Sequence, residues 1–331
     1  MEMHVREELC FPQFLNSSCK KPQSSWKEFL LLQIMLSSLS LLTSTLNLLV
    51  IISVSYFKQL HTPTNILLLS LAISDLLVGL LLMPVEIIRN TACWIFGDFS
   101  CSLYNSVSLI ITFSSVGDVV LISIDRYMAI CDPLHYSSRV TERRVKVCVC
   151  VCWLCSVFYG ILIVKDDFTK PSRYSVCLGQ CIITADYIAG TVDLMVSFII
   201  PVTIIIVLYM RVFIVAVSQA RAMRSHITFF TLQLSATQTS KKSELKAGRT
   251  LGVLVVVFLI CFCPYHCVSF AGNDMLSDSF LSYALFLLYF NSTINPLIYA
   301  LFYPWFRKAV KLIGTLQILQ PGSYKANILC K

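Results

Sequence analysis

The amino-acid sequence predicts an all-α integral membrane protein: a seven-transmembrane-helix bundle with a short amphipathic eighth helix. Hydrophobic residues fill 56% of the 331 positions and charged residues only 13%, and the mean hydropathy is +0.75. A soluble domain of this length needs far more charge to cover its surface. The apolar residues also cluster into seven runs of about 20 residues, each long enough to cross a ~30 Å hydrocarbon layer.

The seven runs are predicted to be helices, because an open sheet leaves backbone groups unpaired in lipid. They begin near Phe29, Thr64, Phe99, Val145, Tyr187, Arg249 and Phe280. Most are apolar all round, as expected where lipid covers the outer face. The competing interpretation, a soluble core of seven buried helices, lacks residues for a covering layer. The predicted organisation is an outer tail (1–28), the bundle (29–303), a membrane-surface helix (304–316) and a C-terminal tail (317–331).

The basic residues predict the orientation of the chain. With the N-terminus outside, 18 of the 26 Lys and Arg residues lie on the inner side, which is the bias that fixes topology. The net charge of +8 therefore reflects membrane insertion, and no nucleic-acid partner is expected. In the eighth helix, Arg307, Lys308 and Lys311 alternate with apolar residues, as suits a helix lying on lipid. In the outer tail, Asn16 opens an N-x-S sequon and is a candidate glycosylation site.

The cysteines fall into two groups. Cys148, Cys150, Cys152 and Cys155 lie within the fourth span, where packing of small apolar thiols is favoured over a metal or redox cluster. The outer group, in an oxidising compartment where disulfides persist, consists of Cys10, Cys19, Cys101, Cys177 and Cys181. Cys101 opens the third span and Cys181 lies just before the fifth, so a bridge between them would pin the second outer loop over the bundle.

Polar residues inside the predicted spans are functional candidates, because burying them in lipid is costly. The third span ends with Asp125-Arg126-Tyr127, the sixth contains Cys261-Phe262-Cys263-Pro264, and the seventh contains Asn295-Pro296-Leu297-Ile298-Tyr299. An arginine between two carboxylates at the inner membrane edge is a paired charge that can exchange partners, as in a conformational switch. A static ion pair that only fixes packing is the alternative.

Taken in order with Asn47, Asp75, Trp153, Pro201 and Tyr209, these motifs resemble the rhodopsin-like G-protein-coupled receptor family over roughly residues 30–313. The resemblance implies that Arg126 engages a heterotrimeric G protein after release from Asp125 and Glu244. It also implies that Tyr209 and Tyr299 swing inward on activation. Phe262 stands where the family usually has tryptophan, so the trigger in the sixth span departs from the family pattern. No enzymatic activity is expected, because no nucleophile, base or metal cluster has a credible arrangement.

The deepest acid of the second span, Asp75, has several expected neighbours with oxygen atoms: Ser115, Asn291, Ser292 and Asn295. Hard oxygen ligands suit a hard cation, and in related receptors such residues hold sodium. We expect no cofactor beyond a structural sodium ion here. A hydrated network without the ion would have the same sequence pattern.

The stretch from Asn291 to Phe306 resembles the fingerprint of the trace amine-associated receptors at every defining position. The paired cysteines Cys177 and Cys181 and the N-terminal Cys19 resemble further features of that family. The resemblance implies the pairings Cys101–Cys181 and Cys19–Cys177, with Cys10 as the alternative partner of Cys177. It also implies a plasma-membrane receptor of olfactory sensory neurons for small primary amines or polyamines, signalling through a stimulatory or olfactory G protein to cyclic AMP.

Amine receptors in general bind the ligand's charge with an aspartate in the outer half of the third span, and this sequence departs from that pattern. The matching position here is Ser108, whose hydroxyl cannot neutralise a cation. Asp193, eight residues before Pro201 in the fifth span, offers a substitute, and Ser197 one turn on is expected to orient its carboxylate. This arrangement resembles a branch of the family, expanded in fishes, with the acid in helix five. The alternative is a structural Asp193 in a receptor for an uncharged or peptide ligand.

By the same resemblance, Thr112, Tyr265, His266 and Tyr289 line the rest of the cavity, where aromatic faces favour a cation. Glu86, near the outer end of the second span, has two interpretations. It holds a second charge of a diamine or polyamine if it faces inward, or it is a solvated or Arg89-paired acid at the loop edge. Asp118 in the third span has no evident role in the sequence.

Overall fold

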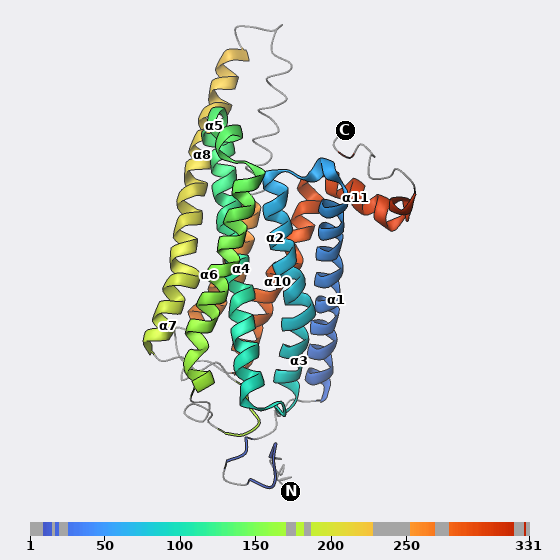
Figure 1. The fold of residues 1–331 in the computed structure, drawn as a ribbon, viewed down its shortest axis with the longest axis vertical. Helices are drawn as coiled ribbons and strands as arrows, with labels where there is room; N and C mark the ends of the chain where they lie inside the picture. Colours follow the sequence, from blue (N-terminus) through green and yellow to red (C-terminus); the bar gives the residue numbers. More distant parts are fainter. Residues whose placement is uncertain are drawn as a thin grey trace.

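The structure, a computed structural model, describes residues 9–14, 17–19, 26–169, 177–181, 187–227, 252–268, 278–320 and 328. Within these residues the chain is helical and contains no strand. The helices run side by side along the long axis of the molecule (Figure 1), with the first described residues, 9–14, at one end of the bundle and α11 at the other. We call these the N-terminal end and the C-terminal end.

Seven helical segments cross the bundle, and two of them contain π-helical turns, named η2 and η4. The segments are α1 (Trp26–Tyr56); α2 (Pro63–Leu77) with η2 (Val78–Leu82) and α3 (Met83–Thr91); α4 (Gly97–Cys131); α6 (Glu142–Thr169); α7 (Tyr187–Asp193) with η4 (Leu194–Ile199) and α8 (Ile200–Ile227); the helix Gly252–Val268; and α10 (Asp278–Phe302). A short helix, α5 (Pro133–Arg139), lies in the connection between α4 and α6. Each π-helical turn holds one residue more than an α-helical turn, so it rotates the side chains that follow it.

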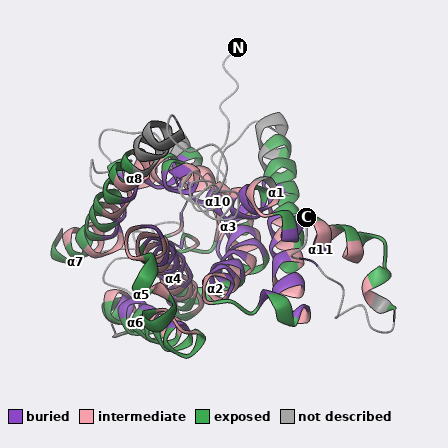
Figure 2. Ribbon diagram, turned by 90° about the horizontal axis from the view of Figure 1, so that it is seen from above, coloured by how far each residue is buried: buried purple, intermediate pink, exposed green. Residues whose placement is uncertain are grey.

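Buried residues face the centre of the bundle and exposed residues face outward, as the view along its axis shows (Figure 2). Among the described residues, five segments are by themselves long and apolar enough to span a membrane. Their outward faces carry large apolar side chains such as Leu41, 71% exposed, and Phe158, 69% exposed. A water-soluble surface rarely shows such continuous apolar patches. The predicted seven-transmembrane bundle is therefore confirmed, with lipid as the solvent of its outer face.

The ends of several helices have identifiable signals. Thr62 caps α2, because its hydroxyl accepts a hydrogen bond from the Asn65 amide at 3.3 Å and Pro63 follows in the first turn. At the C-terminal end, the chain bends by 99° between α10 and α11 (Pro304–Gly314). Arg307 of α11 donates to the Ala300 carbonyl at 2.8 Å, which satisfies an otherwise open acceptor at the end of α10. The surface helix expected over 304–316 corresponds to α11.

The cysteines of the fourth span do not converge on one another. Cys152 lies against Gly117 of α4, where an added Cβ would stand 2.3 Å from its sulfur. Cys148, Cys150 and Cys155 are exposed on the outer face of α6. In the described part of the chain, no three His, Cys, Asp or Glu side chains are grouped to hold a metal ion. Cys152 thus serves the packing of α6 on α4, as the sequence favoured.

Three disulfides lie at the N-terminal end of the bundle, within the described residues: Cys101–Cys181, Cys19–Cys177 and Cys10–Cys93. The first two are the expected pairs. The third corrects the sequence analysis, which offered Cys10 as an alternative partner of Cys177 and left Cys93 out. Its geometry follows from the backbone, because the Cys10 amide donates to the Cys19 carbonyl at 2.8 Å and so lies beside that bridge. The candidate glycosylation site Asn16 lies outside the described residues.

Candidate functional site

The carboxylate of Asp193 is bound by a tyrosine from a different helix. Asp193 ends α7, and Tyr159, buried on α6, donates its hydroxyl proton to Asp193 Oδ1. The Tyr159 ring stacks on Phe113 of α4 with 4.5 Å between centroids. Packing against α4 therefore holds the donor in place, and the donor fixes the direction of the carboxylate. Sequence reasoning missed Tyr159, since its position 34 residues before Asp193 gives no periodic signal.

Ser197 plays a smaller part at this carboxylate than expected. Its hydroxyl lies within hydrogen-bonding reach of the Asp193 side chain, but the hydrogen bond of 2.6 Å goes to the Asp193 backbone carbonyl. Such back-bonding is common for serine inside helices, and here it falls within the π-helical turn Leu194–Ile199. Ser197 thus lies on the same side of the helix as Asp193, while Tyr159 is the donor that orients the acid.

An aromatic stack adjoins this region on the helix Gly252–Val268. His266, 6% exposed, stacks on Phe198 of η4 with 4.5 Å between centroids, and Phe262 stacks on Phe258 at 4.2 Å. Tyr265 contacts the His266 ring edge-on. The expected cavity residues Ser108 and Thr112 are half-buried on α4, and Tyr289 is buried on α10. The fifth and sixth spans are therefore joined by aromatic packing through the π-helical turn that follows Asp193 in the chain.

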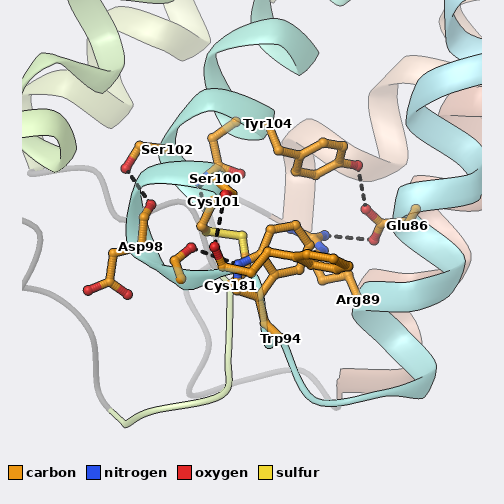
Figure 3. Close-up of a disulfide and its surroundings, with 12 residues drawn as sticks. Glu86, Arg89, Trp94, Asp98, Ser100, Cys101, Ser102, Tyr104 and Cys181 are labelled. Atoms are coloured by element: carbon orange, nitrogen blue, oxygen red, sulfur yellow. Dashed lines mark hydrogen bonds and ion pairs between the residues drawn. A yellow bond between two sulfur atoms is a disulfide. The ribbon is translucent and has the colours of Figure 1, made fainter.

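Glu86 is a buried acid that forms an ion pair with Arg89 of the same helix. Its side chain is 3% exposed, and Oε1 accepts a hydrogen bond of 2.7 Å from Arg89 Nη2. Tyr104 of α4 donates to Oε2 at 3.1 Å. Figure 3 shows Tyr104 and Arg89 converging on Glu86 from two sides, beside the Cys101–Cys181 disulfide. The Arg89-paired interpretation holds, but the acid is shielded within α3 and is not a solvated residue at a loop edge.

Asp75 lies at the centre of a polar group between α2 and α10. It is 0% exposed, and Asn295 donates to its Oδ2 at 2.8 Å. Its other oxygen has no hydrogen-bond partner among the described protein atoms. The expected neighbours Ser115, Asn291 and Ser292 are each at most 4% exposed. One buried carboxylate with an open oxygen and several hydroxyl and amide oxygens fits the ligand set of a hard monovalent cation.

Asp118, which had no role in the sequence analysis, belongs to a second polar group between α2, α4 and α6. Ser70 of α2 donates to its Oδ2 at 2.9 Å, and Trp153 of α6 donates its indole N–H to the Ser70 hydroxyl at 3.1 Å. The chain of bonds joins three helices through Ser70. Asp118 Oδ1 has no hydrogen-bond partner among the described protein atoms, so the group is only partly satisfied, although its bonds tie α2 to α4 and α6.

Near the C-terminal end of the bundle, Asp125 pairs with Arg126 and accepts hydrogen bonds from two hydroxyl groups. Arg126 Nε donates to Asp125 Oδ2 at 2.9 Å, and Nη2 contacts both that oxygen and the Thr64 hydroxyl. Thr64 and Tyr136 donate to the two carboxylate oxygens at 2.9 and 2.7 Å. Burial raises the pKa of Tyr136, so its hydroxyl keeps the proton that it donates. The Arg126 side chain is only 14% exposed, and this network holds it in place.

The other residues expected to form the switch are distributed along the C-terminal half of the bundle. Tyr127 and Tyr209 are half-buried on α4 and α8, while Phe262, Pro296 and Tyr299 are buried. The Tyr299 hydroxyl has no hydrogen-bond partner within the described residues. Glu244, the second expected partner of Arg126, lies outside them. The structure thus brings Arg126 together with Asp125 and adds Thr64 and Tyr136, which the sequence did not single out.

Comparisons with known proteins agree with this architecture. The profile of the seven-transmembrane receptors of the rhodopsin family matches residues 46–299. Trace amine-associated receptor 13c of Danio rerio is 35% identical over 97% of this chain and 96% of its own length. Trace amine-associated receptor 6 of Pan troglodytes is 36% identical over 98% and 96%, and trace amine-associated receptor 1 of Homo sapiens is 34% identical over 95% and 96%. With the fold, the Asp125–Arg126 pair and these similarities together, the chain belongs to the trace amine-associated receptors, a group within the rhodopsin family of seven-transmembrane receptors, and is a signalling receptor, not an enzyme.

Proposed function

We propose that the protein is a receptor for small amines in which Asp193 pairs with the ligand ammonium. The observation that carries the proposal is the environment of this carboxylate. Tyr159 orients Asp193 by a hydrogen bond, and no Lys or Arg in the described part of the chain forms an ion pair with it. An oriented acid without a cationic partner is a ready site for a cation from outside the chain.

Energetics support an ammonium at this position. Inserting a lone carboxylate at the centre of a membrane helix costs about 2.5–3.5 kcal/mol on insertion scales, and a paired ammonium offsets that cost. With Ser108 in place of the usual acid of the third span, the charged end of the amine points toward the fifth span.

The proposal extends to signalling and location. The N-terminal end, where the three disulfides lie, faces the extracellular space, since such bridges persist under oxidising conditions. Arg126 at the opposite end engages a G protein of the stimulatory or olfactory class when its bonds to Asp125 open, and cyclic AMP rises. The names of the relatives and the fingerprint in α10 support the amine class. The plasma membrane of olfactory sensory neurons is the proposed location.

A sodium ion at Asp75 belongs to the same proposal. The open Oδ1 atom and the surrounding oxygens of Ser115, Asn291 and Asn295 support it, because a cation would satisfy the buried oxygen that has no partner. Agonist affinity should then be lower in sodium chloride than in N-methyl-D-glucamine chloride at equal ionic strength. Asp75→Asn should abolish that difference, and an unchanged sodium effect in this variant would exclude the site.

The decisive experiment measures cyclic AMP in cells exposed to a panel of primary monoamines, diamines and polyamines. Asp193→Asn keeps the shape of the side chain and removes its charge, so amine potency should fall at least about 150-fold, as expected for a broken buried charge pair. Asp98→Asn removes an exposed acid at the same end of the bundle and should respond as wild type.

If amines act equally on Asp193→Asn at matched surface expression, Asp193 is structural. The receptor then recognises an uncharged or peptide ligand, and the amine assignment falls.

A further inference from the structure

The buried carboxylate of Glu86 lies at the junction of α3 and α4, at the N-terminal end of the bundle. The carboxylate accepts hydrogen bonds from Arg89 on its own helix and from Tyr104 of α4. The Tyr289 hydroxyl of α10 lies within reach of the Tyr104 hydroxyl. All of these side chains are buried or nearly so, with Glu86 3% and Tyr289 4% exposed. Side chains of α3 and α4 therefore meet at one buried carboxylate, whose positive partner is Arg89.

We propose that the surroundings of Glu86 form a second cation subsite, which Arg89 occupies as an internal cation, and that Arg89 thereby makes the receptor select singly charged over doubly charged amines. The proposal rests on the proposed function, since it concerns the second charge of an amine whose first charge binds Asp193. It assigns Glu86 as the acceptor of a second ammonium and Arg89 as the residue that excludes it.

The contacts separate the role of Arg89 from those of the two tyrosines. Arg89 and Glu86 are an i,i+3 pair within α3, so their bond ties no two helices together. The connection between helices is instead the hydrogen bond from Tyr104 of α4 to Glu86 of α3. Arg89 thus supplies charge compensation, and another cation of similar size can supply the same compensation. A terminal primary ammonium donates up to three hydrogen bonds, enough to replace the bond from Arg89 Nη2 to Glu86 Oε1.

Trp94 and the Cys101–Cys181 disulfide shield the Glu86–Arg89 pair from water. Trp94, 7% exposed, lies over Tyr104 with 6.3 Å between ring centroids. Its amide donates to the Gly179 carbonyl at 2.9 Å, and its indole N–H donates to the Gly97 carbonyl at 2.9 Å. Figure 3 shows Trp94 and the Cys101–Cys181 bridge beside Arg89 and Tyr104. In such a shielded place, a buried carboxylate without a cation is strongly unfavourable. Removal of Arg89 therefore leaves Glu86 unpaired and favours binding of a ligand ammonium there.

The test compares n-alkylamines with α,ω-diaminoalkanes of three to eight carbons on purified receptor and in the cyclic AMP assay. The quantity measured is the ratio of monoamine to diamine concentration needed for half-maximal effect, and in parallel the shift of the unfolding temperature by each compound. Wild type should favour monoamines. Arg89→Gln should shift the ratio toward diamines at least about tenfold at the best chain length, because the buried charge of Glu86 is now free to pair.

Two further variants separate this effect from a structural one. Glu86→Gln/Arg89→Gln removes both charges and should return the ratio to the wild-type value. Lys146→Gln deletes the cation of an exposed ion pair, that with Glu142 at 3.7 Å, and should leave the ratio unchanged. If the Glu86–Arg89 pair is merely structural, Arg89→Gln should lower expression or thermal stability and leave the monoamine-to-diamine ratio unchanged in both assays. That result would overturn the proposal.

The two proposals fail in distinguishable ways. If monoamines act through Asp193 but Arg89→Gln gains nothing with diamines, only the second subsite is wrong. If no amine activates wild type or shifts its unfolding temperature, the proposed function is wrong. The subsite is then wrong as well, with one exception. It stands if diamines raise the unfolding temperature of Arg89→Gln selectively and the Glu86→Gln/Arg89→Gln variant loses that shift.

Discussion

The hydroxyl of Tyr209 on α8 lies directly against Gly252, the first described residue of the neighbouring helix. A Cβ atom built on Gly252 would stand 2.0 Å from Tyr209 Oη and 2.7 Å from Cζ. Real Cβ atoms do not approach other atoms so closely. The fifth and sixth spans therefore take this spacing at the C-terminal half of the bundle only because residue 252 has no side chain.

Gly252→Ala should therefore destabilise the bundle, because either the Tyr209 ring or the helix must move. Overpacking of this kind costs about 1–3 kcal/mol. Thermal unfolding of the purified receptor measures the loss, and Gly252→Ala/Tyr209→Ala should recover most of it. Gly190→Ala is the matched control, because nothing lies within 4 Å of its Cβ position. Equal unfolding temperatures for Gly252→Ala and Gly190→Ala would contradict the contact.

Tyr159→Phe should weaken amine binding without abolishing it. The substitution removes the donor to Asp193 Oδ1 and keeps the ring on Phe113. A hydrogen bond to a charged group contributes about 1.5–3 kcal/mol, so potency should fall between about tenfold and 150-fold, less than in Asp193→Asn. Dose–response curves for cyclic AMP give the comparison. A potency equal to wild type would mean that the hydroxyl does not position the acid for its ligand.

Asp125→Asn should raise basal signalling in the absence of ligand. The change removes the negative charge that holds the Arg126 guanidinium, while Thr64 and Tyr136 lose the charged acceptor of their hydrogen bonds. Basal cyclic AMP at matched surface expression is the measurement. Asp132→Asn, which alters the nearby exposed pair with His135, should behave as wild type. If basal signalling is the same in both variants, the Asp125–Arg126 pair serves packing alone.

Replacing Cys10 and Cys93 together by serine should destabilise the receptor less than their sequence separation suggests. The loop between them spans 83 positions, for which the chain-entropy relation gives about 4.5 kcal/mol. The other two disulfides shorten the covalent loop that Cys10–Cys93 closes. With them intact, this loop consists only of residues 10–19, 177–181 and 93–101. A loop of that size corresponds to about 3.4 kcal/mol. Denaturant unfolding distinguishes the two values, provided that both remaining bridges are verified by mass spectrometry.

The sequence predicted the helices well because each span carries its own apolar signal. It predicted the Cys101–Cys181 and Cys19–Cys177 pairs through family resemblance. Cys93 was missed because it lies between the second and third spans without a motif, and only the fold brings it to Cys10. The π-helical turn Leu194–Ile199 also has no clear sequence signal, and it determines how Ser197 is placed relative to Asp193.

Partners on other helices were the hardest to foresee. Glu86 and Arg89 are three residues apart, so the sequence included their pairing as an alternative. The donor to Asp193 comes from α6, and the donor to Asp118 comes from α2. Such contacts depend on the rotation of each helix about its axis, which an all-round apolar span leaves unspecified. The acids were visible in the sequence, but the hydroxyl groups that orient them were not.

The helix that supplies Tyr159 lies at the edge of the bundle. On either side of Tyr159, Phe158 is 69% and Ile161 54% exposed, so acyl chains touch the same turn that orients Asp193. A change in hydrocarbon thickness tilts or shifts a transmembrane helix at modest energetic cost, and here it would move the tyrosine relative to the acid. Amine affinity in nanodiscs should accordingly vary with acyl-chain length, and this dependence should vanish in Tyr159→Phe. The bilayer itself then acts as an effector of the receptor.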